Sequence, residues 1–97
     1  MFLTYVRHKV MDFAQWRNVF DANIPMLRSS GVIDTWITKI NDDGTDVAIV
    51  TTWPSRKNWD AFIAAHNFNG KDDFRKAQEK AGVIGEPEFV CGEVAGS

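Results

Sequence analysis

Two histidines are the side chains of this chain best suited to proton transfer near neutral pH. His8 lies in an alternating run near the N-terminus, and His66 lies at the end of a helical segment. A neutral imidazole can remove a proton next to a carbonyl or from a phenol, which leaves a carbanion open to dioxygen or to ring closure. Each histidine also has a purely structural interpretation. His8 would be buried and hydrogen-bonded to Thr51 or a backbone carbonyl, and His66 would interact with the last carbonyls of its helix.

The other reactive side chains offer less chemistry. Alternation places the single tyrosine, Tyr5, on the face of its strand opposite His8. The single cysteine, Cys91, is expected to be a small buried hydrophobe, and it excludes an intrachain disulfide. The histidines stand in no metal-ligand spacing and the chain has no Gly-rich phosphate loop, so we predict neither a metal nor a cofactor.

A unit used twice supplies the elements that must position these residues. Residues 6–20 and 49–62 each contain an alternating strand followed by a helix, opened by Asp12 in the first unit and Ser55 in the second. Aligning the two units places His8 and Thr51 on the same face of two strands. That face carries the larger apolar side chains, so we assign it to the helices.

The order of the expected elements predicts an α+β fold. The β-α-β-β-α-α-β order is the ferredoxin-like plan with one extra helix, in a single domain of residues 1–97. Pro25 is expected to kink or restart the first helix near Asn23. Right-handed crossovers put the helices on one face of a four-stranded antiparallel sheet. We expect strands over 2–10, 32–40, 47–53 and 89–94, and helices from Asp12, from Ser55 and over 71–81.

The face of the sheet without helices is too apolar for full exposure to water. Leu3, Tyr5, Ala48 and Val50 are expected there, and Arg7, Lys9, Thr35 and Lys39 are interspersed among them. By the same alternation Trp36 falls on the helix-facing side. Covering the bare face with the same face of a second copy predicts an isologous homodimer.

Composition excludes several classes of partner. The net charge is −2 and the basic residues are scattered, so the chain has no electrostatic footprint for nucleic acid or an anionic membrane. No apolar run approaches the roughly 20 residues of a membrane span, and no signal peptide is recognisable. We expect a cytoplasmic protein.

Three segments resemble the dimeric α/β-barrel superfamily, which includes the antibiotic-biosynthesis monooxygenases and small cyclase-like proteins. They are VRHKVMDFAQWRNVFD at 6–21, TTWPSRKNWDAF at 51–62 and KAGVIGEPEF at 80–89. The resemblance implies a dimer that forms an α/β barrel, with a ligand cavity in each subunit between the sheet and the helices. His8 and Thr51 would then be catalytic, and the substrate-binding residues would be Trp16, Trp36, Trp59, Phe62 and His66.

Two hypotheses about function follow, and they fall in different classes. The first is a homodimeric monooxygenase or cyclase that acts without cofactor on an aromatic or polyketide-like molecule, with His8 as base oriented by Thr51. The second is a non-catalytic dimer of the same fold that binds a metabolite or a partner protein, with its cleft largely filled by its own side chains. One branch of the superfamily degrades haem, but Gln78 stands where that branch carries a histidine, so haem is not predicted.

Overall fold

The computed structural model describes residues 1–66 and 82–96. The expected helix over 71–81 lies outside these residues, and the last strand begins earlier than expected. In chain order the elements are β1 (Phe2–Val10), α1 (Phe13–Ser29), β2 (Asp34–Lys39), β3 (Asp46–Trp53), α2 (Arg56–His66) and β4 (Val83–Glu93).

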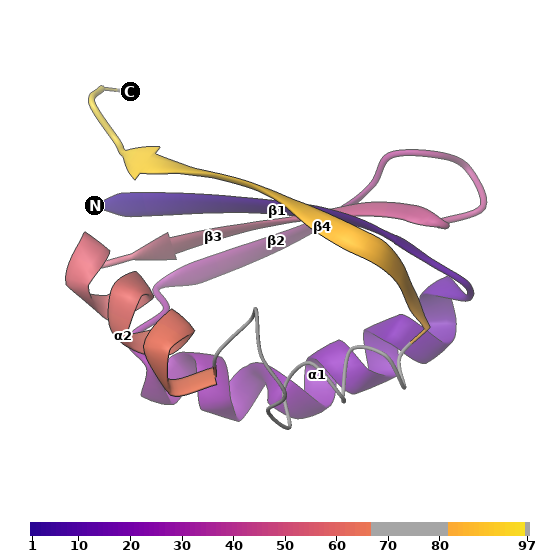
Figure 1. Cartoon of the computed structure of the whole chain (residues 1–97), viewed down its shortest axis with the longest axis horizontal. Coiled ribbons are helices and arrows are strands. Elements are labelled where there is room, and N and C mark those ends of the chain that lie inside the picture. Colours follow the sequence, from indigo (N-terminus) through magenta and orange to yellow (C-terminus); the bar gives the residue numbers. More distant parts are fainter. Residues whose placement is uncertain (67–81, 97) are drawn as a thin grey trace.

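The four strands form one antiparallel sheet in the order β2-β3-β1-β4. The first and third strands are therefore the central neighbours, as the sequence predicts. Figure 1 shows α1 and α2 on the same side of this sheet, while no described element covers the other side. The ferredoxin-like α+β plan is confirmed.

Alternation along the two central strands builds the core on the helix side. On that side every second residue of β1 and β3 is buried except the half-buried Val6 and Ile49, because the pleat sends successive side chains to opposite faces. Two separate hydrophobic clusters result, one under the start of α1 and one under α2. Their buried members are Val10, Trp16 and Val47 in the first, and Phe2, Trp53 and Phe62 in the second.

The predicted phase of β2 is wrong by one residue. Ile37 faces the helices and packs against the first cluster, whereas Trp36 lies on the bare face with 53% of its surface exposed. Thr35 and Lys39 share the side of Ile37, and the Lys39 ammonium lies 5.0 Å from the centre of the Phe13 ring. One residue of phase exchanges every side chain of a strand between faces.

Helix α1 begins and ends at signals present in the sequence. The Asp12 carboxylate accepts a hydrogen bond from the Gln15 backbone N–H at 3.0 Å, which is the N-cap predicted there. At the other end Gly31 has a φ of 99°, as an αL glycine after a helix does. Pro25 lies inside the helix on its exposed side, and the expected restart near Asn23 is absent, because α1 is one continuous helix.

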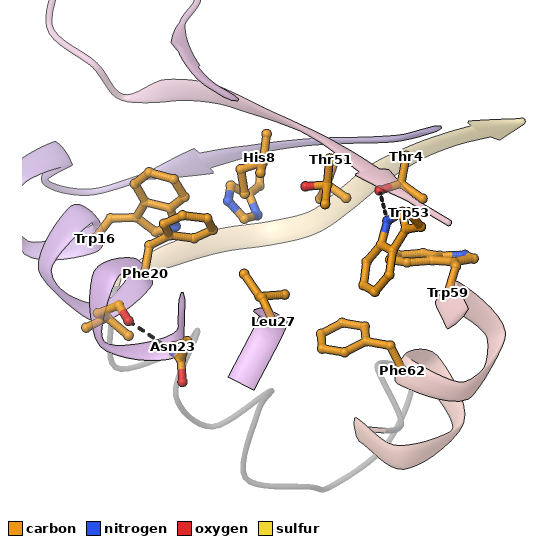
Figure 2. Close-up of a pocket in the computed structure, with 13 residues that line it drawn as sticks. Thr4, His8, Trp16, Phe20, Asn23, Leu27, Thr51, Trp53, Trp59 and Phe62 are labelled. Carbon is orange, nitrogen blue, oxygen red and sulfur yellow. Dashed lines mark hydrogen bonds between the residues drawn. The ribbon is translucent and has the colours of Figure 1, made fainter. Parts of the chain in front are cut away.

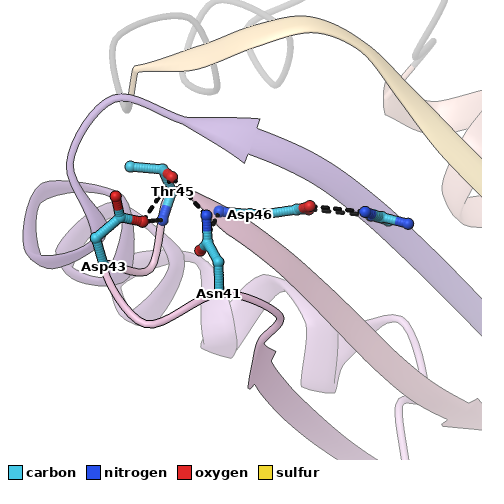
Figure 3. A network of polar contacts seen from close by, with 5 residues as sticks. Asn41, Asp43, Thr45 and Asp46 are labelled. Carbon is cyan, nitrogen blue, oxygen red and sulfur yellow. Dashed lines mark hydrogen bonds and ion pairs between the residues drawn. The ribbon is translucent and has the colours of Figure 1, made fainter.

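A polar network orders the turn between β2 and β3 (Figure 3). The Thr45 hydroxyl donates to Asp43 at 2.7 Å and accepts from the Asn41 amide at 2.8 Å. The Asn41 oxygen accepts from the Asp46 backbone N–H, and the Asp46 carboxylate receives two hydrogen bonds from Arg7, at 3.0 and 2.7 Å. The Arg7 guanidinium lowers the pKa of Asp46, so this pair stays ionised near neutral pH.

Candidate functional site

A cavity of about 70 Å³ lies between the two core clusters, with the sheet as its floor and the helices as its roof (Figure 2). The clusters pack each end of the sheet against a helix, and the side chains between them do not fill the space. Its walls are mostly aromatic and aliphatic. They comprise Thr4, Val6, His8, Trp16, Val19, Phe20, Asn23, Leu27, Ile49, Thr51, Trp53, Trp59 and Phe62.

His8 is the polar centre of this cavity. Its side chain is 3% exposed, and within residues 1–66 and 82–96 neither ring nitrogen has a hydrogen-bond partner. The edge-on Trp16 ring lies 5.6 Å away at an interplanar angle of 76°. Burial lowers the pKa of His8 to about 4. The ring is therefore neutral at pH 7, with one N–H donor and one nitrogen acceptor, and the described residues satisfy neither.

The backbone is irregular where His8 sits. Arg7 pairs with Glu88 and Lys9 with Ile84 across β1 and β4, so three β4 residues face the single position of His8. One of the three is Pro87, which an edge strand tolerates because that strand need not complete a hydrogen-bond ladder. Bulges of this kind redirect side chains and are common beside active sites.

Thr51 lies on the same face as His8 but does not bond to it. In the register of β1 and β3, Thr51 is opposite Thr4, and His8 is opposite Val47. Four residues of β3 separate the two positions, which is roughly 13 Å along an extended strand. The expected hydrogen bond by which Thr51 would orient His8 is therefore not formed in the described part of the chain. The alignment of the two halves gave the correct face and the wrong distance.

The aromatic residues named from the sequence divide between cavity and surface. Trp16, Trp59 and Phe62 line the cavity with His8 and Thr51. Trp36 does not, because it lies on the opposite face of the sheet. His66 is the last residue of α2, and its side chain is outside what the structure describes.

Sequence reasoning missed two polar features of the walls. The buried Trp53 indole N–H donates to the Thr4 hydroxyl at 3.1 Å. The half-buried Asn23 amide donates to the Val19 carbonyl at 3.0 Å from the roof. Both were detectable, since Thr4 shares the alternation of His8, and Asn23 follows Trp16 by seven residues on one helix face.

The described residues show no further cluster for chemistry. Across residues 1–66 and 82–96, no group of three His, Cys, Asp or Glu side chains is placed to hold a metal ion. Neither α1 nor α2 combines the length and apolarity that a bilayer span requires. The cavity around His8 is thus the candidate site.

Solved structures match this arrangement over nearly the whole chain. A dimeric ferredoxin-like protein from an uncultured marine organism has a TM-score of 0.67 at 12% identity, covering 100% of this chain and 97% of its own. The chain has the ferredoxin-like fold. SnoaB, a cofactor-independent oxygenase from Streptomyces nogalater, matches with a TM-score of 0.73 at 14% identity over 99% of this chain and 95% of its own.

A third match comes from Nitrosomonas europaea. This putative antibiotic biosynthesis monooxygenase has a TM-score of 0.72 at 15% identity, covering 98% of this chain and 99% of its own. No protein-family description and no curated protein matches the sequence. At these identities the matches show the fold, which the resemblance of the sequence predicts, and the chemistry must be argued from the site.

Proposed function

We propose that the chain is a homodimeric oxygenase that acts without a cofactor on an aromatic small molecule, with His8 as the proton acceptor. The observation that carries this proposal is the pair of buried ring nitrogens of His8, which have no hydrogen-bond partner in the described part of the chain and lie in an aromatic cavity. A buried polar group without a partner costs about 1–3 kcal/mol, so it has to be explained. A ligand that bonds to it is the explanation we favour. SnoaB, which shares the fold, is described as a cofactor-independent oxygenase.

The low pKa of His8 limits the proton transfer that it can perform. Moving a proton from a phenol of pKa about 10 to an imidazole of pKa about 4 costs roughly 8 kcal/mol. Pairing of the resulting phenolate and imidazolium returns roughly 4 kcal/mol at 4 Å and an effective dielectric constant of 20. The remaining cost is small beside the barrier of roughly 17 kcal/mol for one turnover per second. His8 can therefore act as base only on a substrate whose anion stays beside it.

The oxidation balances with dioxygen as the sole co-substrate. Once His8 has taken a proton, the delocalised carbanion gives electrons to dioxygen and forms a carbon–oxygen bond. Loss of the ring C–H proton with cleavage of the oxygen–oxygen bond then converts that ring carbon to C=O, so the phenol becomes a quinone, and the second oxygen atom leaves as water with this proton and the one held by His8. The protein supplies the base and a site from which water is largely excluded.

The small cavity favours a second candidate, the non-catalytic binder of the same fold. A dry cavity of roughly 150 Å³ holds benzene, so about 70 Å³ leaves little room for a substrate. A polyketide-like ligand of several rings would have to displace wall side chains. A dimer that binds a small metabolite without turning it over satisfies the same observation.

Oxygen uptake by wild type, His8→Ala and Asn18→Ala separates the two candidates. Monocyclic and bicyclic hydroxyaromatic compounds serve as the panel, and an oxygen electrode gives the rate. We expect at least one compound to drive uptake by wild type, His8→Ala to abolish it, and Asn18→Ala, on the exposed face of α1, to keep it. An active His8→Ala would refute the role of His8, and binding without uptake by wild type would favour the binder.

A further inference from the structure

We infer that the cavity selects uncharged ligands of about one ring that carry their polar atoms on a single edge, which faces His8. The inference rests on the proposed function, because it concerns the same site and names the class of substrate. It follows from which end of the cavity is polar, from the absence of charge in its described walls and from its size.

The polar end is formed by His8. Both ring nitrogens of His8 lack a partner among the described residues. Thr51 pairs with Thr4 across β1 and β3 and so lies toward the other end, and Figure 2 shows its oxygen on the side that faces His8. A neutral imidazole offers one donor and one acceptor, so a ligand edge with a hydroxyl group, alone or beside a carbonyl, can satisfy it.

The opposite end is made apolar by Thr4. Trp53 is 1% exposed, and its indole N–H donates to the Thr4 hydroxyl, which is itself buried with 2% of the residue exposed. Trp53 therefore presents only ring carbons to a ligand. The Trp59 and Phe62 rings complete this end, with centres 5.5 and 5.4 Å from that of Trp53. A ligand hydroxyl placed there would lose its water without gaining a partner from Trp53.

Charge and size narrow the ligand further. No described residue that lines the cavity is a Lys, Arg, Asp or Glu, so an ionised carboxylate would enter without a counter-charge. The volume of about 70 Å³ is below the roughly 150 Å³ of a cavity that holds benzene, and so one ring already requires small movements of the walls. Overpacking a close-packed interior costs free energy, and each further ring of the ligand would raise that cost.

Four compounds of nearly equal size test the inference by binding alone, measured by ligand-observed NMR titration of the full-length chain. They are p-cresol, with one hydroxyl; hydroquinone, with one at each end; p-xylene, with none; and p-toluate, which is anionic. We expect p-cresol to bind tightest and hydroquinone about tenfold more weakly, the cost of one unpaired buried hydroxyl. Equal or tighter binding of hydroquinone or p-toluate, or no binding of p-cresol at millimolar concentration, would overturn the inference.

Variants of Thr4 test its part as a positioning residue. Thr4→Val keeps the shape and removes the acceptor, so the freed indole N–H can meet the second hydroxyl of hydroquinone, and the tenfold preference should disappear. Thr4→Ser retains the hydroxyl and should retain the preference. The indole N–H resonance of Trp53 should shift in Thr4→Val and not in Thr4→Ser. An unchanged preference and resonance in Thr4→Val would refute the role of Thr4.

The two proposals fail in different ways. If the compounds bind in the predicted order but none drives oxygen uptake, the oxygenase activity is refuted and the ligand class stands. Oxygen uptake driven by an anionic compound, or by one with a hydroxyl at each end, together with a reversed order of binding, would refute the ligand class and leave the oxygenase intact. If Thr4→Val does not fold, the wild-type order of p-cresol and hydroquinone decides the inference.

Discussion

His8 is kept in a place where the folded protein gains little from it. It makes no hydrogen bond among the described residues, and its surroundings disfavour the charged form. Leucine or phenylalanine would satisfy the same site without a desolvated nitrogen. A residue that lowers stability in this way is typical of functional sites, where activity and stability compete.

The depressed pKa of His8 predicts a specific loss of stability in acid. The unfolded chain binds a proton on this ring below about pH 6.5, whereas the folded chain does so only below about pH 4. Between these values the unfolded state holds more protons, so the stabilisation present above about pH 6.5 is lost as the pH falls to about 4. The free energy of unfolding should decrease by about 3 kcal/mol from this group, as measured by urea denaturation across the range.

His8→Gln isolates that contribution, because glutamine is polar and does not titrate. The other titrating groups, including Asp43 and Asp46, are common to both chains, and their lowered pKa values act at more acidic pH. The free energy of unfolding of wild type should therefore fall relative to that of His8→Gln by about 3 kcal/mol between pH 6.5 and pH 4. Parallel curves for the two chains would contradict a neutral buried His8.

Alternation predicts the face of His8 and leaves its partners open. The period of two in residues 2–10 is enough to place His8 beside Thr4 and opposite Tyr5, and the structure agrees. Whether an imidazole nitrogen meets a hydroxyl depends on the register between β1 and β3. That register is set by the hairpin and by packing far along the chain, so Thr51 was assigned to the right face and to the wrong role.

At the scale of elements, α1 shows a conflict between local propensity and tertiary packing. Pro25 removes the backbone N–H that would bond to the Asp21 carbonyl, which is why the sequence predicts a break. Both residues lie on the exposed side, so water can donate a hydrogen bond to the Asp21 carbonyl. Residues of the buried side before and after Pro25, including Phe20 and Leu27, pack over the same cavity, and this packing favours a continuous helix.

Replacing the proline should therefore stabilise the protein. Pro25→Ala restores the missing hydrogen bond and the helical propensity, and we expect the free energy of unfolding to rise by about 1–3 kcal/mol. Pro54→Ala is the matched control, because Pro54 is exposed, lies outside the helices, and should change stability little or lower it slightly. A Pro25→Ala chain no more stable than Pro54→Ala would mean that α1 is already relieved of the strain.

The phase of β2 shows where pattern reasoning fails for an element. Residues 34–39 put Trp36 on one face and Ile37 on the other, each among polar neighbours, so hydrophobicity alone does not choose between them. The turn sets the register of β2 against β3, and with it the face of each β2 residue, because the Ile40 N–H bonds to the Asp46 carbonyl and Lys39 then pairs with Val47. In β1 and β3, by contrast, one face is clearly richer in large apolar groups, and there the prediction is confirmed.

At the scale of the whole molecule, the face of the sheet opposite the helices is an exposed apolar surface that calls for a partner. Trp36, Ile84 and Val90 lie on it with 53%, 53% and 64% of their surfaces exposed. The ion pair of Arg7 and Asp46 crosses the same face and can be paired internally when water is removed. A large apolar face around a satisfied ion pair fits association with a second copy, in which the same patch of each copy covers that of the other.

A charge on that apolar surface should therefore separate the subunits. We expect the wild type to sediment as a dimer of about 22 kDa, twice the 11.0 kDa chain. Trp36→Glu should yield a folded monomer at micromolar concentration, because an isologous interface would bury an unpaired charge from each copy. Met11→Glu is the matched control, since Met11 is 71% exposed in the turn before α1 and should leave the dimer intact. A monomeric wild type, or a dimeric Trp36→Glu, would show that copies of this chain do not associate through the sheet.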